Sequence, residues 1–444
     1  MKSHCTAIVL LGLLGAGSVA SAQSSPIGLT LADAITRGLE NSHRLAEIKA
    51  REEGAKAAVE VAAAADRPLV GASASYSRTN HVTEFAVPQP NGSRLVVYPD
   101  IPDNLLSRVS FQWPIFTSGR TDALERAAAA EAAAVGSEIE VARADLRFEI
   151  SRAYWAVVTA REAVRVLDVS SERIDAQLKD AQQRFAVGLI PPNEVSTLEA
   201  QRARERAQRL EADNLHRSSI VELARLIGAP PGSAIEPTDS IAQPTPVFRH
   251  SNESSMVEEA LSHRPELKAL ASRVNGAAFR ERAVSSATKP TISLIGGVDY
   301  ARPNPRIFPR KGEWQESWDV GVNVNWAFLD FGRTKAQRVE AAAMTKAARE
   351  RLADVEAVIS ADVRQRLMDR DSAHAIAEVA DAAVKSAIEA RRVVAERFGA
   401  GVATSTDLIV AQVAQLETEL ARTRALANLR LAEARLERSM GGSR

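Results

Sequence analysis

The sequence offers no basis for thiol chemistry in the mature chain. Its single cysteine, Cys5, precedes an apolar run at residues 7–16, which follows Lys2 and leads into an Ala-x-Ala cleavage site ending at Ala22. This order is typical of a secretory signal peptide, and about ten apolar residues are too few to span roughly 30 Å of hydrocarbon. We therefore expect residues 1–22 to be removed on export, with Cys5 among them. Disulfides, thiolate metal sites and a cysteine nucleophile are then excluded.

The chain also lacks a net charge and long apolar runs. Lysine plus arginine and aspartate plus glutamate each number 56, so there is no basic field and no nucleic-acid partner is expected. Beyond residue 22 no stretch approaches the roughly 18 apolar residues of a transmembrane helix, so a membrane span would have to use strands. Histidines without metal-ligand spacing and the lack of a nucleophile elbow predict no catalytic residue, no metal, no cofactor and no enzyme activity.

An internal repeat organises what is present. Residues 113–120 match residues 326–333, and residues 184–188 match residues 397–401, both at an offset of 213. Such self-similarity at a fixed offset predicts two copies of one structural unit.

Earlier in each half the offset is 222, since Pro68 falls on Pro290. The nine-residue difference lies between the proline and the tryptophan of each half, so the first half has the longer loop. The expected organisation is a first repeat at 23–228, a proline-rich linker at 229–255 and a second repeat at 256–444.

Long helices are the dominant prediction. Aromatic residues make up only 5% of the chain while alanine is abundant, and residues 334–398 contain neither glycine nor proline. Those 65 residues would form a rod of roughly 100 Å at 1.5 Å per residue. The counterpart is predicted at 120–187, and return helices at 194–227 and 407–440.

A shorter helix is expected ahead of each strand pair. In the first half it begins with the capping pair Thr30 and Asp33 and continues to Asp66, where Pro68 stops it. Apolar residues spaced by four and three between Ile409 and Ala427 predict a coiled-coil contact in the last helix. A two-stranded coiled coil would explain that spacing but not the strands.

Four strands alternate between polar and apolar residues, strictly at residues 317–328 and more weakly in the first half. A half-buried sheet on a soluble core would alternate too, but helices extending about 100 Å away leave the apolar side only lipid to contact. The predicted lipid-facing residues are Phe111, Trp113, Ile292, Leu294, Trp318, Val320, Val322, Val324 and Trp326. The predicted lumen-facing residues are Arg108, Ser110, Gln112, Thr291, Ser293, Asp299, Asp319, Asn323 and Asn325.

Four strands cannot close a barrel, and open edges are not tolerated in hydrocarbon. Two chains would supply eight strands, which leave an interior filled by side chains, whereas three supply twelve and enclose a lumen. The expected fold is mainly α, with coiled-coil helices forming a periplasmic α-barrel and four strands per chain contributing to a trimeric twelve-stranded β-barrel. The loop at about 79–104, which prolines should keep irregular, is expected outside the cell.

Over nearly the whole mature chain the sequence resembles the TolC family of outer-membrane factors. Residues 113–120 and 326–333 resemble its strand-to-helix motif, and residues 263–267 its arginine-proline motif. The resemblance implies a passive homotrimeric duct in the Gram-negative outer membrane, extending into the periplasm. Its partners would be a periplasmic adaptor and an inner-membrane transporter of the RND, ABC or MFS class. The helical-hairpin turns would form the adaptor-docking tip, with Arg184, Phe185, Gly188, Glu194, Arg397, Phe398, Gly401 and Asp407.

Some members of that family narrow the entrance with aspartates about nine and twelve residues before the second turn glycine. Here those positions hold Arg392 and Glu389, so only one carboxylate is kept in type. The two residues are therefore candidates for the periplasmic entrance, or alternatively solvated helix charges.

The competing function is a periplasmic coiled-coil adaptor or scaffold, which would share the signal peptide and long helices but would not need four amphipathic strands.

Overall fold

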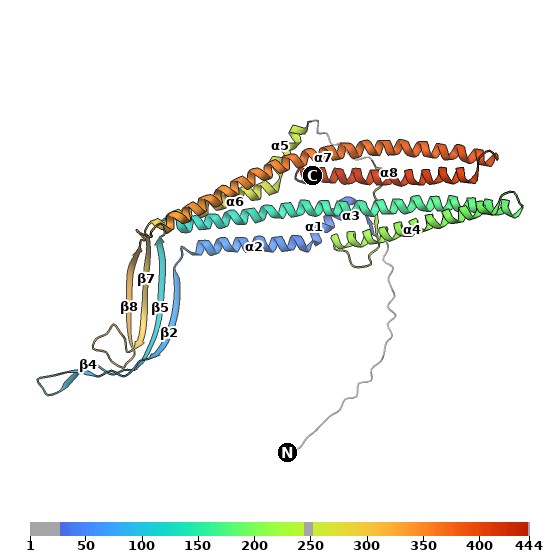
Figure 1. Ribbon diagram of the computed structural model, residues 1–444. Coiled ribbons are helices and arrows are strands. Elements are labelled where there is room, and N and C mark those ends of the chain that lie inside the picture. Colours follow the sequence, from blue (N-terminus) through green and yellow to red (C-terminus); the bar gives the residue numbers. More distant parts are fainter. Residues whose placement is uncertain (1–26, 244–251, 443–444) are drawn as a thin grey trace, which may run out of the picture.

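The computed structural model describes residues 27–243 and 252–442. The expected signal peptide lies outside these residues. Helices run side by side over most of the length of the molecule, and a sheet stands at one end of them (Figure 1).

Two helical hairpins of equal size form the body. The long helices α3 (Arg120–Ala186) and α7 (Arg333–Gly399) each have 67 residues, and the return helices α4 (Pro192–Leu226) and α8 (Ser405–Ser439) each have 35. At 1.5 Å per residue the long helices measure about 100 Å. The predicted rods and return helices are confirmed to within two residues at each end.

The short helix of each half is broken, which corrects the prediction of a continuous helix to Asp66. The first half has α1 (Leu31–Asn41) and α2 (His43–Ala64), and the second has α5 (Glu253–His263) and α6 (Pro265–Ser285), followed by one 3-10 turn (Ser286–Thr288). The breaks fall at Ser42 and Arg264, 222 residues apart, with ψ of 115° and 117°.

Proline explains the second break, because the residue before a proline is disfavoured in the α region. In the first half His43 stands in the place of Pro265, so the sequence gives no such signal. Instead, the Ser42 side chain accepts a hydrogen bond from the Leu45 amide and starts α2 as its N-cap.

The sheet has four antiparallel strands in the order β2-β5-β7-β8. They are β2 (Leu69–Arg78), β5 (Asp103–Phe116), β7 (Thr291–Arg302) and β8 (Gln315–Asn325). Each repeat supplies one neighbouring pair, and β2 and β8 are left as open edges.

The long loop of the first half is more ordered than predicted. Between β2 and β5 it contains a second hairpin, β3 (Phe85–Pro88) with β4 (Arg94–Tyr98). The prolines end these strands instead of preventing them, since Pro88 is the last residue of β3 and its partner is Arg94. The prediction that this loop is irregular is therefore wrong.

The predicted linker is also partly structured. Its strand β6 (Ile235–Pro237) pairs in parallel with β1 (Ile27–Leu29). The Tyr154 hydroxyl of α3 lies 2.9 Å from the Leu29 carbonyl oxygen and 2.7 Å from Asp239 Oδ2. Burial is the main cause that raises the pKa of this tyrosine. The linker thus packs on the first repeat around the largest buried apolar cluster of the described residues, with Ile150, Val157 and Leu223 at its centre.

Candidate functional site

Strand register divides the sheet into two faces of opposite character. Cross-strand partners lie on the same face, and Arg108 opposes Asp299, which in turn opposes Ser317. All nine residues predicted to face a lumen lie on this one polar face. Eight of the nine residues predicted to face lipid lie on the other, where Phe111 opposes Gly296 and Gly296 opposes Val320. The ninth, Trp326, follows directly after the end of β8.

The apolar face is uncovered. Trp318 is 74% exposed, and Val320, Val322 and Val324 beside it are exposed to more than 60%. The helices that could have covered this face extend away from the sheet instead (Figure 1). A row of bare apolar side chains on alternate positions of a strand fits contact with hydrocarbon, not with water.

The polar face is organised around Arg108. Its Nη1 lies 2.9 Å from both carboxylate oxygens of Asp299, and its Nη2 lies 2.9 Å from Asp319. The guanidinium crosses directly over Gly297, where an added Cβ would lie 2.8 Å from Nη2. One arginine on β5 therefore joins β7 and β8 by charge-assisted hydrogen bonds, and Gly297 leaves room for its guanidinium over β7.

Two tryptophans fasten the sheet to the preceding helices in the same way in each half. Trp113 Nε1 donates to the Asp66 carbonyl oxygen, and Trp326 Nε1 donates to that of Thr288, both at 3.0 Å. The tryptophans are 213 residues apart and their acceptors 222. The same hydrogen bond therefore occurs in both repeats, at the junction between strands and helices.

At the opposite end, each hairpin turns on a left-handed glycine. Gly188 has φ of 75° and Gly401 has φ of 76°, and their amides donate to the carbonyl oxygens of Phe185 and Phe398 at 2.9 and 3.0 Å. The next amide in each turn donates to the carbonyl oxygen of Arg184 or Arg397, both at 2.9 Å. These are the paired bonds of helix C-termini that end in a left-handed residue.

The two turns lie against each other. The Arg184 guanidinium stands 5.1 Å from the ring centroid of Phe398, and Asp180 binds the same arginine at 2.9 Å. Val187, Leu189 and Val402 remain exposed around this contact. The tip predicted from sequence is thus one surface built from both repeats, with apolar side chains open to solvent.

The two acids predicted at the tip, Asp407 and Glu194, differ in whether they cap a helix. Asp407 accepts from the Thr404 amide at 2.9 Å and the Thr404 hydroxyl at 2.8 Å, which caps α8 and lowers the pKa of this carboxyl. Glu194 lies in the first turn of α4, which has no side-chain cap. Asp407 is therefore already engaged in capping its own helix.

Glu389 and Arg392 pair with each other. They are joined at 2.6 Å within one exposed face of α7, and Glu396 binds Arg392 from the next turn. The hydrogen bond from Arg392 lowers the pKa of Glu389. These are ion pairs within one helix. Both residues are charged and solvent-exposed, and neither is enclosed by groups from another element.

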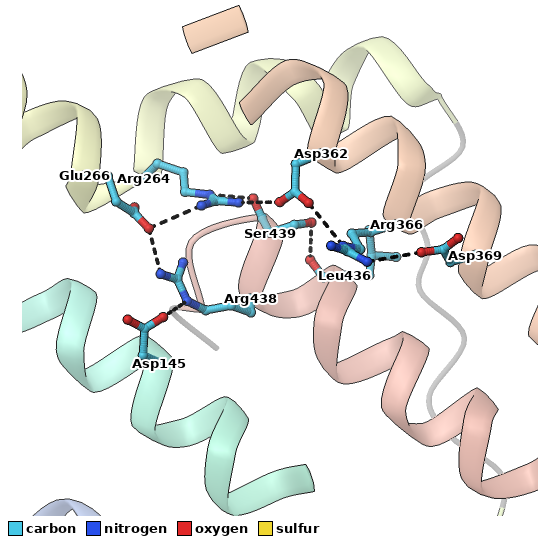
Figure 2. A network of polar contacts seen from close by, with 9 residues as sticks. All are labelled: Asp145, Arg264, Glu266, Asp362, Arg366, Asp369, Leu436, Arg438 and Ser439. Carbon is cyan, nitrogen blue, oxygen red and sulfur yellow. Dashed lines mark hydrogen bonds and ion pairs between the residues drawn. The ribbon is translucent and has the colours of Figure 1, made fainter. Parts of the chain in front are cut away.

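A polar junction of the second repeat was not predicted as a site. Figure 2 shows Arg264 reaching Glu266 at 3.2 Å, Asp362 at 3.0 Å and the Ser439 carbonyl oxygen at 2.7 Å. Arg438 binds Glu266 at 2.6 Å and Asp145 at 2.7 Å. The junction ties the α5–α6 break to α7, α8 and the α3 helix of the other repeat. Its only signal in the sequence was the arginine-proline motif at residues 264 and 265.

Burial and ion pairing oppose each other at this junction. Burial alone would raise the pKa of Glu266, but the hydrogen bond and charge of Arg438, with Arg264 behind it, lower it below its ordinary value. The carboxylate is therefore held ionised inside the protein.

Within residues 27–243 and 252–442, no cluster of histidine, cysteine, aspartate or glutamate side chains is arranged to hold a metal ion. In the same ranges no helix has the length and apolarity needed to cross a membrane. The residues brought together by the fold are those of the two-faced sheet and of the helical tip.

Comparison with known proteins decides the family. The family model described as outer membrane efflux protein matches residues 34–229 and 256–442, and so spans both repeats. The chain belongs to the outer membrane efflux protein family. It is accordingly a channel protein of the outer membrane that extends into the periplasm, and it is neither an enzyme nor a periplasmic adaptor or scaffold.

Individual relatives are distant but nearly full length. The outer membrane protein TolC of Vibrio cholerae is 22% identical over 404 residues, covering 90% of this chain and 88% of the relative. The crystal structure of the outer membrane protein VceC from Vibrio cholerae matches with a TM-score of 0.78 at 21% identity, covering 93% of this chain and 96% of that one. The CmeC outer membrane channel of Campylobacter jejuni matches with a TM-score of 0.76 at 17% identity, covering 93% and 85%. The two solved outer membrane proteins share the fold of this chain.

Proposed function

We propose that three copies of the chain close a twelve-stranded barrel continued by a helical tunnel, and that this passive duct is the outer-membrane part of a tripartite efflux or type I secretion system. The observation that carries the proposal is the four-stranded sheet with two open edges and one uncovered apolar face. In hydrocarbon each open edge needs a partner strand, and β2 of one copy is the natural partner for β8 of the next.

The polar face then lines the lumen. Arg108, Asp299 and Asp319 would be costly if they faced lipid, whereas facing water inside the barrel they cost little. The apolar face, with Trp318 near the start of β8 and Trp326 just past its end, contacts the outer-membrane lipid.

The helical tip is the proposed docking surface for partners. It lies at the far end of the long helices from the sheet, so with the sheet in the outer membrane it reaches deep into the periplasm. Val187, Leu189 and Val402 give it exposed apolar contacts, and Arg184 and Phe398 hold the two turns together. We assign this surface to a periplasmic adaptor, which couples the duct to an inner-membrane transporter of the RND, ABC or MFS class.

Thiol labelling tests the barrel directly, because Cys5 is the only natural cysteine. In trimers purified in detergent and returned to vesicles, Asn323→Cys on the polar face should react with a charged, membrane-impermeant thiol reagent. The neighbouring Val322→Cys on the apolar face should not. A monomer as the dominant species in mild detergent, or equal labelling at both positions, would overturn the proposed barrel.

The tip is tested separately by placing a photo-crosslinker at Val402 in cells and identifying the trapped proteins by mass spectrometry. An adaptor or transporter subunit is the expected product. A crosslinker at Val339, exposed near the sheet end of α7, serves as the control that should not trap them.

A further inference from the structure

The loop that joins β7 to β8, residues 303–314, does not continue outward from the sheet. It folds back over the polar face. Asn304 at its start is only 1% exposed, and its side-chain amide donates to the Gln315 carbonyl oxygen and to Ser317 Oγ, both at 3.0 Å. Ser317 lies on the polar face, opposite Asp299.

Burial along β7 shows which face the loop covers. Asp299 and Ala301 on the polar face are 4% and 1% exposed, whereas their neighbours Val298 and Tyr300 on the apolar face are more than half exposed. No second copy is present to bury the polar face, so the cover must come from the same chain. The β7–β8 loop, together with the Arg108 side chain, supplies this cover.

Arg306 fastens the middle of the loop. Its Nη2 lies 2.6 Å from Asp319 Oδ1 and 3.6 Å from Asp299 Oδ2, so it shares both acids with Arg108. Asp319 is the fifth residue of β8 and directly follows Trp318 of the apolar face. The loop therefore reaches down to the depth of that tryptophan.

The second half of the loop is held by other contacts. Trp314 stacks on Tyr300 with ring centroids 4.9 Å apart, and Arg310 donates to the Tyr98 hydroxyl of β4 at 2.9 Å. Neither contact involves the acids of the polar face. Loss of the Arg306 contacts would thus free the middle of the loop without releasing it at its base.

We propose that the β7–β8 loop narrows the outer mouth of the duct, and that the ion pairs of Arg306 with Asp319 and Asp299 hold it in the narrowing position. This inference rests on the proposed function, since it requires the polar face to line the lumen. Three copies would then bring three such loops to the mouth of one barrel. Passage of bulky solutes would depend on displacing them, which makes Arg306 a residue that sets the size limit of export.

The test is the conductance of full-length trimers in planar bilayers. Arg306→Gln removes the charge that holds the loop and should raise single-channel conductance about twofold, because a pore conducts according to its narrowest constriction. Arg306→Lys keeps the charge and should stay near the unaltered protein. Lys311→Gln, an equal change of charge at an exposed position of the same loop, should also leave conductance unchanged. Replacement of residues 304–313 by a tight Asn-Gly turn gives the conductance of the open mouth.

Two outcomes would overturn the inference. If the loop replacement conducts no better than the unaltered protein, the loop is not a constriction; if Arg306→Gln behaves as Lys311→Gln does, the ion pairs do not hold it. Labelling of Asn323→Cys in the same preparations separates these failures from failure of the barrel itself. When Asn323→Cys is labelled the polar face lines the lumen, and a negative conductance result then counts against the loop alone.

Discussion

Arg209 of α4 forms an ion pair with Asp168 of α3, and the same pair recurs between Arg422 of α8 and Asp381 of α7. Each arginine contacts its acid through Nε, and each pair spans 41 residues of sequence. The two pairs are offset by 213 residues, the offset of the repeat. The helical hairpins are therefore equivalent in their side-chain pairing as well as in length.

These pairs should set the register of each hairpin more than its stability. Their side chains are one third to one half exposed, and exposed ion pairs contribute about 0–1 kcal/mol. Arg209→Ala should lower the unfolding temperature of the detergent-solubilised trimer only slightly. The exchange of charges, Asp168→Arg with Arg209→Asp, should restore it. A loss of several kcal/mol from Arg209→Ala would show that the pair is not merely a surface contact.

The turn glycines should matter for export before they matter for folding. An added Cβ at Gly188 or Gly401 meets no atom within 4 Å, so the penalty of a substitution comes from the left-handed backbone, about 1–2 kcal/mol for a residue other than glycine. Gly401→Val with Gly188→Val should leave trimer yield near normal while abolishing export and adaptor cross-linking.

Gly399→Val is the matched control for this double variant. Gly399 lies two residues before Gly401 in helical conformation, with open space around its Cβ, and its substitution should preserve export. Normal export by the double variant would contradict the assignment of the tip, and failure of the double variant to insert would make the glycines purely structural.

The β3–β4 hairpin should face the outside of the cell. It leaves the sheet at the end opposite the helices, and the turn at Asn91 and Gly92 is exposed. An epitope inserted after Asn91 should bind antibody on intact cells. The same epitope after Gly401 should bind only once the outer membrane is permeabilised; the reverse pattern would invert the proposed orientation.

The polar junction at Arg264 should make stability depend on acid pH. The folded protein lowers the pKa of Glu266, so the ionised carboxylate stabilises the native state. That contribution is fully present above the ordinary pKa of a glutamate and is lost as pH falls through the lowered value. Glu266→Gln should cost about 2 kcal/mol of unfolding free energy at neutral pH, because Arg438 loses a buried charged partner.

The acid dependence should be weaker in Glu266→Gln than in the unaltered protein, as measured by thermal unfolding at several pH values. Glu258→Gln, on the exposed side of α5, provides the comparison and should change neither quantity. If the acid dependence of stability were unchanged in Glu266→Gln, other carboxylates would be its cause.

Long-range regularity was predictable from the sequence, and local irregularity was not. The absence of glycine and proline between residues 334 and 398 predicted a helix that the structure gives as Arg333–Gly399, and period-two alternation predicted nine polar residues that the strand register places on one face. The break at Ser42 was missed because no proline marks it. The strands β1 and β6 were missed because three residues are too few to show alternation.

Contacts between distant charges were equally invisible. Glu266 and Arg438 are separated by 172 residues. The arginine-proline motif marks the neighbourhood of Glu266, but nothing distinguishes Arg438 from the many solvated charges of a chain that is 25% charged. Arg306 is close to Asp319 in sequence, but a loop between two strands gives no periodicity from which its direction of folding could be inferred. Such contacts depend on tertiary packing, which pattern alone does not encode.

The equal lengths of α3 and α7 constrain how this protein can change. In the proposed trimer the six hairpin turns end at one depth and form a level rim. Lengthening only the first hairpin by seven residues in each of its helices would push three of the six turns about 10 Å past the others. A partner that grips the whole rim would then meet alternating high and low points, so a viable change in the reach of the tunnel has to occur in both repeats at once.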